Sequence, residues 1–327
     1  TILVLRTEAL LTHRMRAHKI ATVQQHYEIT SPSVFVILKK RLQEIERILV
    51  EKSKAASDPN VKVAIDRLTT LVETLNEDAC VSGDCSRVIE IVGNGNMRRA
   101  MRAVGHVFRL DPSTMDKLVA QQARRGNASL RVATVLRGIL KAGRSYYSND
   151  NPECLVPNVL SGDKGVVFPH SLAVRIIRHL RAKTAHQNVT VAELVSDFSI
   201  AGLVADVVRR LLAKMHRQEL ISAVHMKEEL GDEDTLRVTK LAEGIVDDFL
   251  GNRYYLDAMA MDATVYDEKV VQEIRQAWRE IGNVRERFAR VRKLFTEYVL
   301  ADDRVFREDA NLAFLEPAAR GPLDLHS

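Results

Sequence analysis

Two neighbouring arginines at a predicted helix start are well placed to bind a phosphate. The string Gly93-Asn94-Gly95-Asn96 is typical of a turn, and Asn96 can cap a helix that runs from Met97 to about Phe108. The free amides and the positive dipole end of such a helix attract anions. Arg98 and Arg99 lie in its first turn, where a guanidinium can bind a phosphate through two hydrogen bonds. We therefore expect an anion contact here.

A second group of cations lies on helices predicted between residues 169 and 217. These residues are Arg175 and Arg178 on the first helix, and Arg209, Arg210, Lys214 and Arg217 near the end of the third. A recognition helix contacts bases or phosphates with such side chains. However, Asp206 lies within the third helix, and residues 200–204 are apolar or small. If these cations contact nucleic acid, we expect weak phosphate contact with little sequence preference; the other interpretation is that this region binds a partner protein.

The chain lacks the residues that several catalytic and metal-binding sites require. The chain has no Gly-x-x-x-x-Gly-Lys-Ser/Thr motif and no apolar strand that ends in paired acids, so it cannot form the phosphate cradle and metal site of phosphoryl transfer. His13, His18 and His26 have no clustered acids at metal-ligand spacing. Cys80 and Cys85 could supply half of a zinc site, but no second pair follows. We expect neither a catalytic residue nor a metal site.

Composition and charge narrow the class of protein. The 327 residues are 46% apolar and 28% charged, which is enough for two or three domain cores. No stretch approaches the roughly 18 apolar residues of a membrane span, and three cysteines cannot form a disulfide framework. We therefore expect a cytoplasmic protein without membrane contact.

The net charge of +5 is unevenly distributed along the chain. Residues 95–144 contain eleven Lys or Arg and two Asp, whereas residues 227–268 contain four Lys or Arg and twelve acids. This segregation favours one face that meets phosphate and another that meets water or a partner. The alternative is that both segments are solvated helix faces that pair with each other.

Helical periodicity dominates the first half of the chain. Apolar residues at three-and-four spacing predict helices over 34–51, 61–75, 97–108, 113–124 and 128–140. Ser57-Asp58-Pro59-Asn60 separates the first two helices, and Gly, Pro, Asn and Ser between Gly143 and Gly165 predict a linker.

The pattern changes after Pro169. Helices are predicted over 172–180, 190–198 and 200–215, the second opened by a capping box of Thr190 and Glu193. Strand-like segments at 220–224 and 235–238 flank an acidic loop. Three helices followed by a hairpin is the order of a winged helix, a variant of the helix-turn-helix. Residues 241–299 are again helical, and an irregular tail is expected after Asp302.

The string from Gly95 to Met101 resembles the lid of AAA+ ATPases, in which Gly-Asn, one residue and Arg open a helix whose arginine senses the γ-phosphate of the nucleotide. The resemblance implies that Arg98 is this sensor-2 arginine and that Arg99 is the next candidate. The surrounding order is similar to that of initiator-like ATPases and of STAND-like defence and signalling ATPases. Thr1 to Arg6 resembles a strand of the ATPase core, Val34 to Arg41 resembles the first lid helix, and a winged helix follows the lid.

We therefore expect a mainly α protein in which a helical lid bundle precedes a winged-helix domain and C-terminal helices. The expected units are a remnant of the truncated α/β core sheet (1–30), the helical lid domain (31–144), a linker (145–168), the winged-helix domain (169–265), and the C-terminal helices and tail (266–327).

The expected function is that of the lid and winged-helix portion of a P-loop ATPase. ATP and Mg would be bound mainly by residues outside this chain, which alone would catalyse nothing. ATP binding would move the winged helix, which would engage nucleic acid or partner proteins, in antiviral defence or DNA replication, within a homo-oligomer. The alternative is a non-enzymatic winged-helix regulator that binds DNA or protein and has a helical dimerisation domain.

Overall fold

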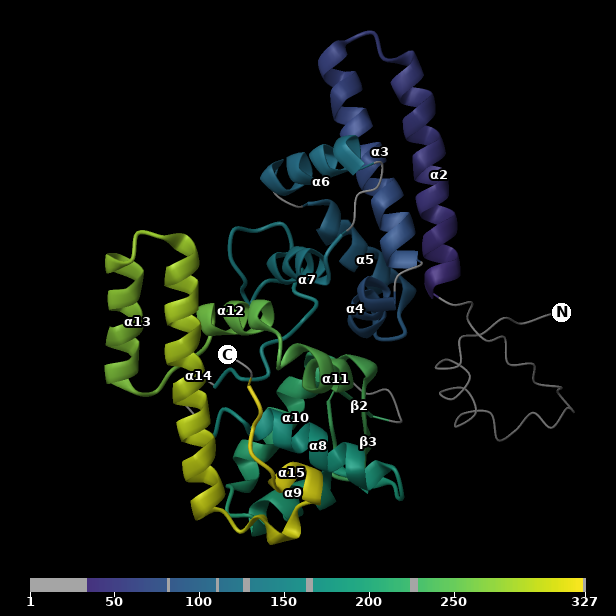
Figure 1. Ribbon diagram of the computed structural model, residues 1–327. Coiled ribbons are helices and arrows are strands. Elements are labelled where there is room, and N and C mark those ends of the chain that lie inside the picture. The colour runs from purple at the N-terminus through teal and green to yellow at the C-terminus, as the bar shows by residue number, and fades with distance from the viewer. Residues whose placement is uncertain are drawn as a thin grey trace, which may run out of the picture.

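The computed structural model describes residues 34–80, 83–109, 112–125, 130–162, 167–223 and 229–325. This part of the chain is mainly helical and contains one small three-stranded sheet (Figure 1), so the predicted mainly α class is confirmed. The predicted core strand Thr1 to Arg6 lies outside the described residues.

Six helices form the first half of the described chain. They are α2 (Val34–Ala55), α3 (Pro59–Cys80), α4 (Gly83–Gly93), α5 (Met97–Phe108), α6 (Pro112–Arg125) and α7 (Val132–Lys141). The predicted break after the first helix is confirmed, and α2 and α3 pack along each other as a projecting hairpin (Figure 1). Leu42 and Leu71 are fully buried, because the apolar stripes of these two helices face the core.

The sheet belongs to the second half. Its strands are β1 (Val189–Thr190), β2 (Ile221–Ala223) and β3 (Thr235–Val238). The helices beside it are α8 (Leu172–Thr184), α9 (Val191–Ile200) and α10 (Ala205–Arg217). Strand β3 lies between β1 and β2 and is antiparallel to both. The capping box of Thr190 and Glu193 is present, as predicted. The sequence analysis missed β1, whose Val189 pairs with Leu236 in the core.

The predicted start of the third helix at Ile200 is wrong. Helix α9 continues to Ile200, and α10 begins at Ala205. Between them Gly202 has a φ of +100°, a conformation that favours glycine and ends the first helix.

The C-terminal part is helical to near its end. It comprises α11 (Lys240–Gly244), the π-helical turn η1 (Ile245–Phe249), α12 (Arg253–Met261), α13 (Glu268–Glu280), α14 (Val284–Asp309), the 3-10 turn η2 (Leu312–Phe314) and α15 (Pro317–Arg320). The prediction of an irregular tail after Asp302 is wrong, because α14 continues for two further turns and α15 then packs on α8.

The segment predicted as a linker also requires a correction. Residues 145–162 contain no helix or strand, but Leu155, Val156 and Leu160 are buried in a hydrophobic core that continues through both halves. The side-chain amide of Asn158 donates to the Met259 carbonyl at 3.1 Å. This segment therefore joins the two predicted domains as packed structure instead of separating them.

Candidate functional site

The start of α5 has the predicted cap. The Oδ1 atom of Asn96 accepts hydrogen bonds from the backbone N–H groups of Arg98 at 2.9 Å and of Arg99 at 3.3 Å. Gly95, with a φ of +72°, makes the tight turn from α4 possible. Two of the amides that a helix start leaves unpaired are thus satisfied.

The two arginines have opposite environments. Arg98 is exposed, and its side chain forms neither a hydrogen bond nor an ion pair with any residue that the structure describes. The acid Glu90, one turn before the end of α4, instead lies 3.5 Å from Lys240. Arg98 is therefore available to a ligand.

Arg99 is held inside the chain. Its side chain is only 12% exposed, and its Nε donates to the Val92 carbonyl at 2.7 Å. Its two terminal nitrogens donate to the Leu155 carbonyl and, at 2.5 Å, to the Glu219 carboxylate. Burial lowers the pKa of Arg99, an effect that Glu219 opposes. These contacts occupy the guanidinium. Arg99, which was predicted as a candidate for nucleotide sensing, is therefore a structural residue.

Arg99 belongs to a tight junction between the two halves. The side chain of Asn94 accepts from the backbone N–H of Leu241 at 3.2 Å, and its amide donates to the Glu219 carbonyl at 3.4 Å. At Gly244 in α11, an added Cβ would lie 2.3 Å from the side chain of Ile91 in α4. Only glycine permits this approach, and the two halves therefore meet through a close-packed contact beside the start of α5.

Four of the predicted nucleic-acid contacts share helix α10. Arg209 pairs with Asp232 in the loop before β3, and Lys214 donates to the Gly162 carbonyl at 3.4 Å. Arg210 and Arg217 are exposed, and their side chains contact no other residue in the described ranges. The outer face of α10 thus presents two unengaged cations.

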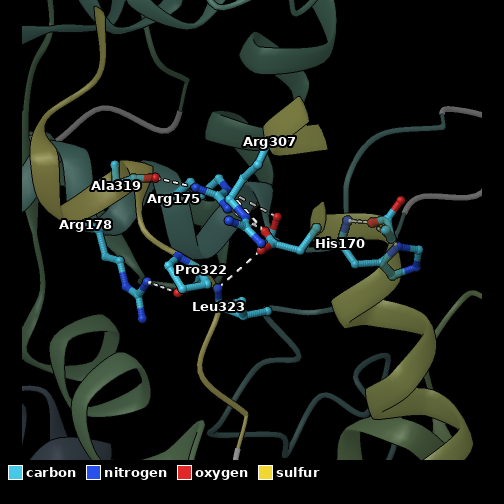
Figure 2. A network of polar contacts seen from close by, with 10 residues as sticks. His170, Arg175, Arg178, Arg307, Ala319, Pro322 and Leu323 are labelled. Atoms are coloured by element: carbon cyan, nitrogen blue, oxygen red, sulfur yellow. Dashed lines mark hydrogen bonds and ion pairs between the residues drawn. The ribbon is translucent and has the colours of Figure 1, made fainter. Parts of the chain in front are cut away.

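Arg175 lies elsewhere and is buried (Figure 2). It is 2% exposed; its Nη2 donates to Asp303 at 2.6 Å, and its Nη1 donates to the Ala319 carbonyl. Its guanidinium also lies 5.4 Å from the centre of the Phe306 ring. The prediction that Arg175 contacts nucleic acid is wrong, because α14 and the segment after it cover this face of α8.

Arg178 is covered by the same segment. Its Nη1 lies 3.5 Å from the Pro322 carbonyl, and burial lowers the pKa of this arginine (Figure 2). Asp303, the acid at the centre of the network, also accepts from the backbone N–H of Leu323 at 3.2 Å. Burial alone would raise the pKa of Asp303, but hydrogen bonds from Ser171 and Arg175 outweigh it and lower the pKa. Arg178, which was predicted to contact nucleic acid, therefore contacts the C-terminal segment instead.

Two buried histidines that were not predicted as site residues form hydrogen bonds with α14 and with the segment that follows it. The Nε2 of His179 lies 2.9 Å from Asp197, and its Nδ1 accepts from the backbone N–H of Glu316 at 2.8 Å. An accepting Nδ1 requires the neutral ring, and burial lowers the pKa of His179 accordingly. His170 contacts Asp302 at 3.1 Å (Figure 2). Their partners lie far along the chain, so no local pattern indicates these contacts.

No cluster of three or more His, Cys, Asp or Glu side chains within the described ranges could hold a metal ion. None of the helices in those ranges has both the length and the apolar character that crossing a bilayer requires. No protein-family model, no curated protein and no solved structure matches this chain.

Proposed function

We propose that this chain is the helical lid and winged-helix portion of an AAA+-type P-loop ATPase of the initiator-like or STAND-like kind. One observation carries the proposal: of two adjacent arginines at the capped start of α5, one is exposed and the other is buried. Arg98 has no hydrogen bond or ion pair to its side chain among the described residues, whereas Arg99 is bonded to Glu219 and to the Leu155 carbonyl. A ligand on Arg98 would thus act one residue away from the junction with the second half.

The topology of the second half supports the winged-helix part of the proposal. Three helices, α8 to α10, pack beside an antiparallel sheet in which β3 is central and β1 is added between α8 and α9. The connection from β2 to β3 corresponds to the wing, and α10 to the recognition helix. The sequence predicts three helices followed by a hairpin, and β1 is an addition to that order.

The described residues fit only a part of a nucleotide site. They supply a cation on a helix start, which suits a γ-phosphate, but no cluster of metal ligands for Mg. ATP and Mg would therefore be held mainly by a P-loop core outside these residues, and ATP would supply the phosphoryl group to be transferred. Arg98 would bind and orient that end of the nucleotide, and the junction would pass a shift of α5 to α10 and α11. Assembly as a homo-oligomer, with partner proteins, belongs to the same proposal.

The test needs the protein together with its ATPase core. The reading frame upstream of Thr1 is expected to encode Walker A and Walker B motifs. A charged hydrogen bond contributes about 1.5–3 kcal/mol, so Arg98→Ala should reduce the rate of ATP hydrolysis, or nucleotide-dependent assembly, about tenfold or more. The melting temperature should not change, since Arg98 makes no side-chain contact within the described chain.

Arg102→Ala is the matched control, because Arg102 is an exposed arginine one turn further along α5. It should leave turnover unchanged. Full activity of the Arg98 variant, or an upstream frame without Walker motifs, would overturn the ATPase proposal.

A second candidate function is nucleic-acid binding by a winged-helix regulator without nucleotide chemistry. The exposed, unengaged Arg210 and Arg217 on the outer face of α10 favour it. The chain should then bind duplex DNA weakly, with little sequence preference and with strong salt dependence. Arg210→Glu with Arg217→Glu should abolish this binding. If the wild-type chain binds no duplex even at low salt, a partner protein is the better interpretation of this face.

A further inference from the structure

A basic cleft lies between helices α6 and α7 on one side and α12 and α14 on the other. Its volume is about 760 Å³, within the range of roughly 300–1,000 Å³ that ligand sites occupy. Helices α7 and α12 pack against each other at this place (Figure 1). The cleft uses none of the residues assigned above to nucleotide or duplex binding.

Cations dominate one wall of the cleft. Helices α6 and α7, with the residue before α7, contribute Lys117, Arg131, Arg137 and Lys141. The first three are exposed, and their side chains form no ion pair with any residue of the described chain. Like charges that outnumber their counter-charges in one space repel one another, and an anionic ligand relieves that repulsion.

The opposite wall adds three arginines, Arg253, Arg285 and Arg292. The lining contains one carboxylate, Asp257, and Arg292 already binds it at 2.6 Å. The Nε of Arg292 is buried and has no hydrogen-bond partner in the described part of the chain.

Aromatic rings border the same space. Tyr146 is 55% exposed at the cleft, and Tyr254 and Phe288 also line it. The ring of Tyr146 meets the edge of Trp278 at 6.3 Å between centroids, and Trp278 meets Phe288 at 5.7 Å. This contact chain holds the Tyr146 ring in place and leaves more than half of the residue open to a ligand.

Phosphate-binding cations beside an exposed, supported ring match the chemistry of unpaired nucleotides. Single-stranded nucleic acid binds to proteins through a cationic groove that follows the backbone and aromatic rings on which bases stack. Inside a duplex, stacking on neighbouring base pairs covers the base faces, and an inorganic anion offers no base to stack on the rings. We propose that this cleft binds single-stranded nucleic acid, with phosphates on the cations of both walls and an unpaired base on Tyr146.

The proposal is independent of the ATPase assignment, and the 327-residue chain can test it directly. Binding of a short fluorescein-labelled oligothymidylate is measured by fluorescence anisotropy as salt is raised, and the matching oligouridylate distinguishes DNA from RNA as the preferred strand. Arg137→Glu with Arg285→Glu reverses one unpaired cation on each wall. Affinity at low salt should fall about tenfold or more. The negative slope of log K against log salt should become less steep by about 1.4, which is 0.7 for each lost phosphate contact.

A matched double variant shows whether the effect is local. Lys52→Glu with Lys54→Glu makes the same change of charge at exposed positions on the end of α2 that is joined to α3, remote from the cleft (Figure 1). It should alter single-strand affinity less than about twofold. Equal losses in the two double variants would mean attraction by net charge alone and would overturn the proposal.

A third measurement tests the role of the ring. Tyr146→Ala should weaken oligothymidylate binding several-fold, and Tyr146→Phe should retain it, because the stacking face is kept. Binding of inorganic polyphosphate, used as a competitor, should not depend on Tyr146. If polyphosphate binds as tightly as the oligonucleotide and Tyr146→Ala changes neither, the cleft is a polyanion site and the nucleic-acid assignment is overturned.

Discussion

The chain holds arginines in two opposite electrostatic settings. At Arg175, an acid, a carbonyl and a hydroxyl take up the donors of one buried guanidinium. In the cleft between α7 and α14, Arg137 and Arg285 face a common space, and the one carboxylate of the lining is bound to Arg292. A buried charge is tolerated only with such partners, whereas an unpaired charge near water can serve a ligand. The number of partners around an arginine, more than its position in the sequence, therefore indicates its role.

The largest expected effect is at the buried network. Arg175→Met leaves Asp303 buried without its main partner, so the free energy of unfolding should fall by about 3–5 kcal/mol. Urea denaturation followed by circular dichroism measures this loss. The variant with both Arg175→Met and Asp303→Leu removes the two charges together and should recover much of the stability. If the double variant is no more stable than the single one, burial of an unpaired charge is not the cause.

A smaller loss is expected at the junction. Arg99→Ala removes the donor of the Val92 and Leu155 carbonyls, and a buried polar group left without a partner costs about 1–3 kcal/mol. Arg98→Ala, the neighbouring exposed position, should change the free energy of unfolding by no more than about 0.5 kcal/mol. Comparable losses from the two variants would contradict the opposite environments assigned to them.

Acidification should loosen the C-terminal segment through His179. Its pKa is lowered in the folded state, so below about pH 6.5 the unfolded chain binds a proton that the folded chain does not. Stability is thus complete above that pH and decreases as the pH falls toward the folded-state pKa, by up to about 1.4 kcal/mol per pH unit. His179→Gln should reduce this slope in unfolding measurements from pH 7 to pH 5. His106, whose pKa burial also lowers, should supply the part that remains.

The smallest effect is expected at the surface pair of Arg209 and Asp232. Both side chains are about half exposed, at 42% and 52%, and water and salt screen such pairs. Arg209→Ala should leave the melting temperature unchanged within error. A clear loss of stability would show that this pair holds the loop before β3, and the contrast between buried and exposed arginines would then be weaker than the structure indicates.

Local signals predicted much of the secondary structure. Helix α5 and strand β3 have the bounds that the sequence indicates, and Asn96, Thr190 and Glu193 cap as expected. A cap depends on residues within one turn, so its partners are visible in a short stretch of sequence. The sequence also shows that residues 95–144 are strongly basic, and the structure places Lys117, Arg131 and Arg137 from that segment on one wall of the cleft.

Contacts between distant segments escaped prediction. Arg175 and Asp303 are 128 positions apart, so Arg175 was indistinguishable in the sequence from an exposed cation. Arg99 was equally indistinguishable, because its partner Glu219 lies 120 positions away. The burial of segment 145–162 was also not predicted, because its Gly, Pro and Asn content is typical of a loop. Turn composition reports how the backbone bends and not what covers it.

The sequence by itself determined much of the helical structure, the caps at Asn96 and Thr190, the order of three helices and a hairpin, and the excess of positive charge, because propensity, capping and periodicity act over a few residues. Tertiary structure alone decided which cations are neutralised and which remain open. Arg285 and Arg292 complete the cleft because α14 packs on α12, and Asp303 at the other end of α14 pairs with Arg175 on α8. An electrostatic environment depends on distances in space, and these are set when the core forms.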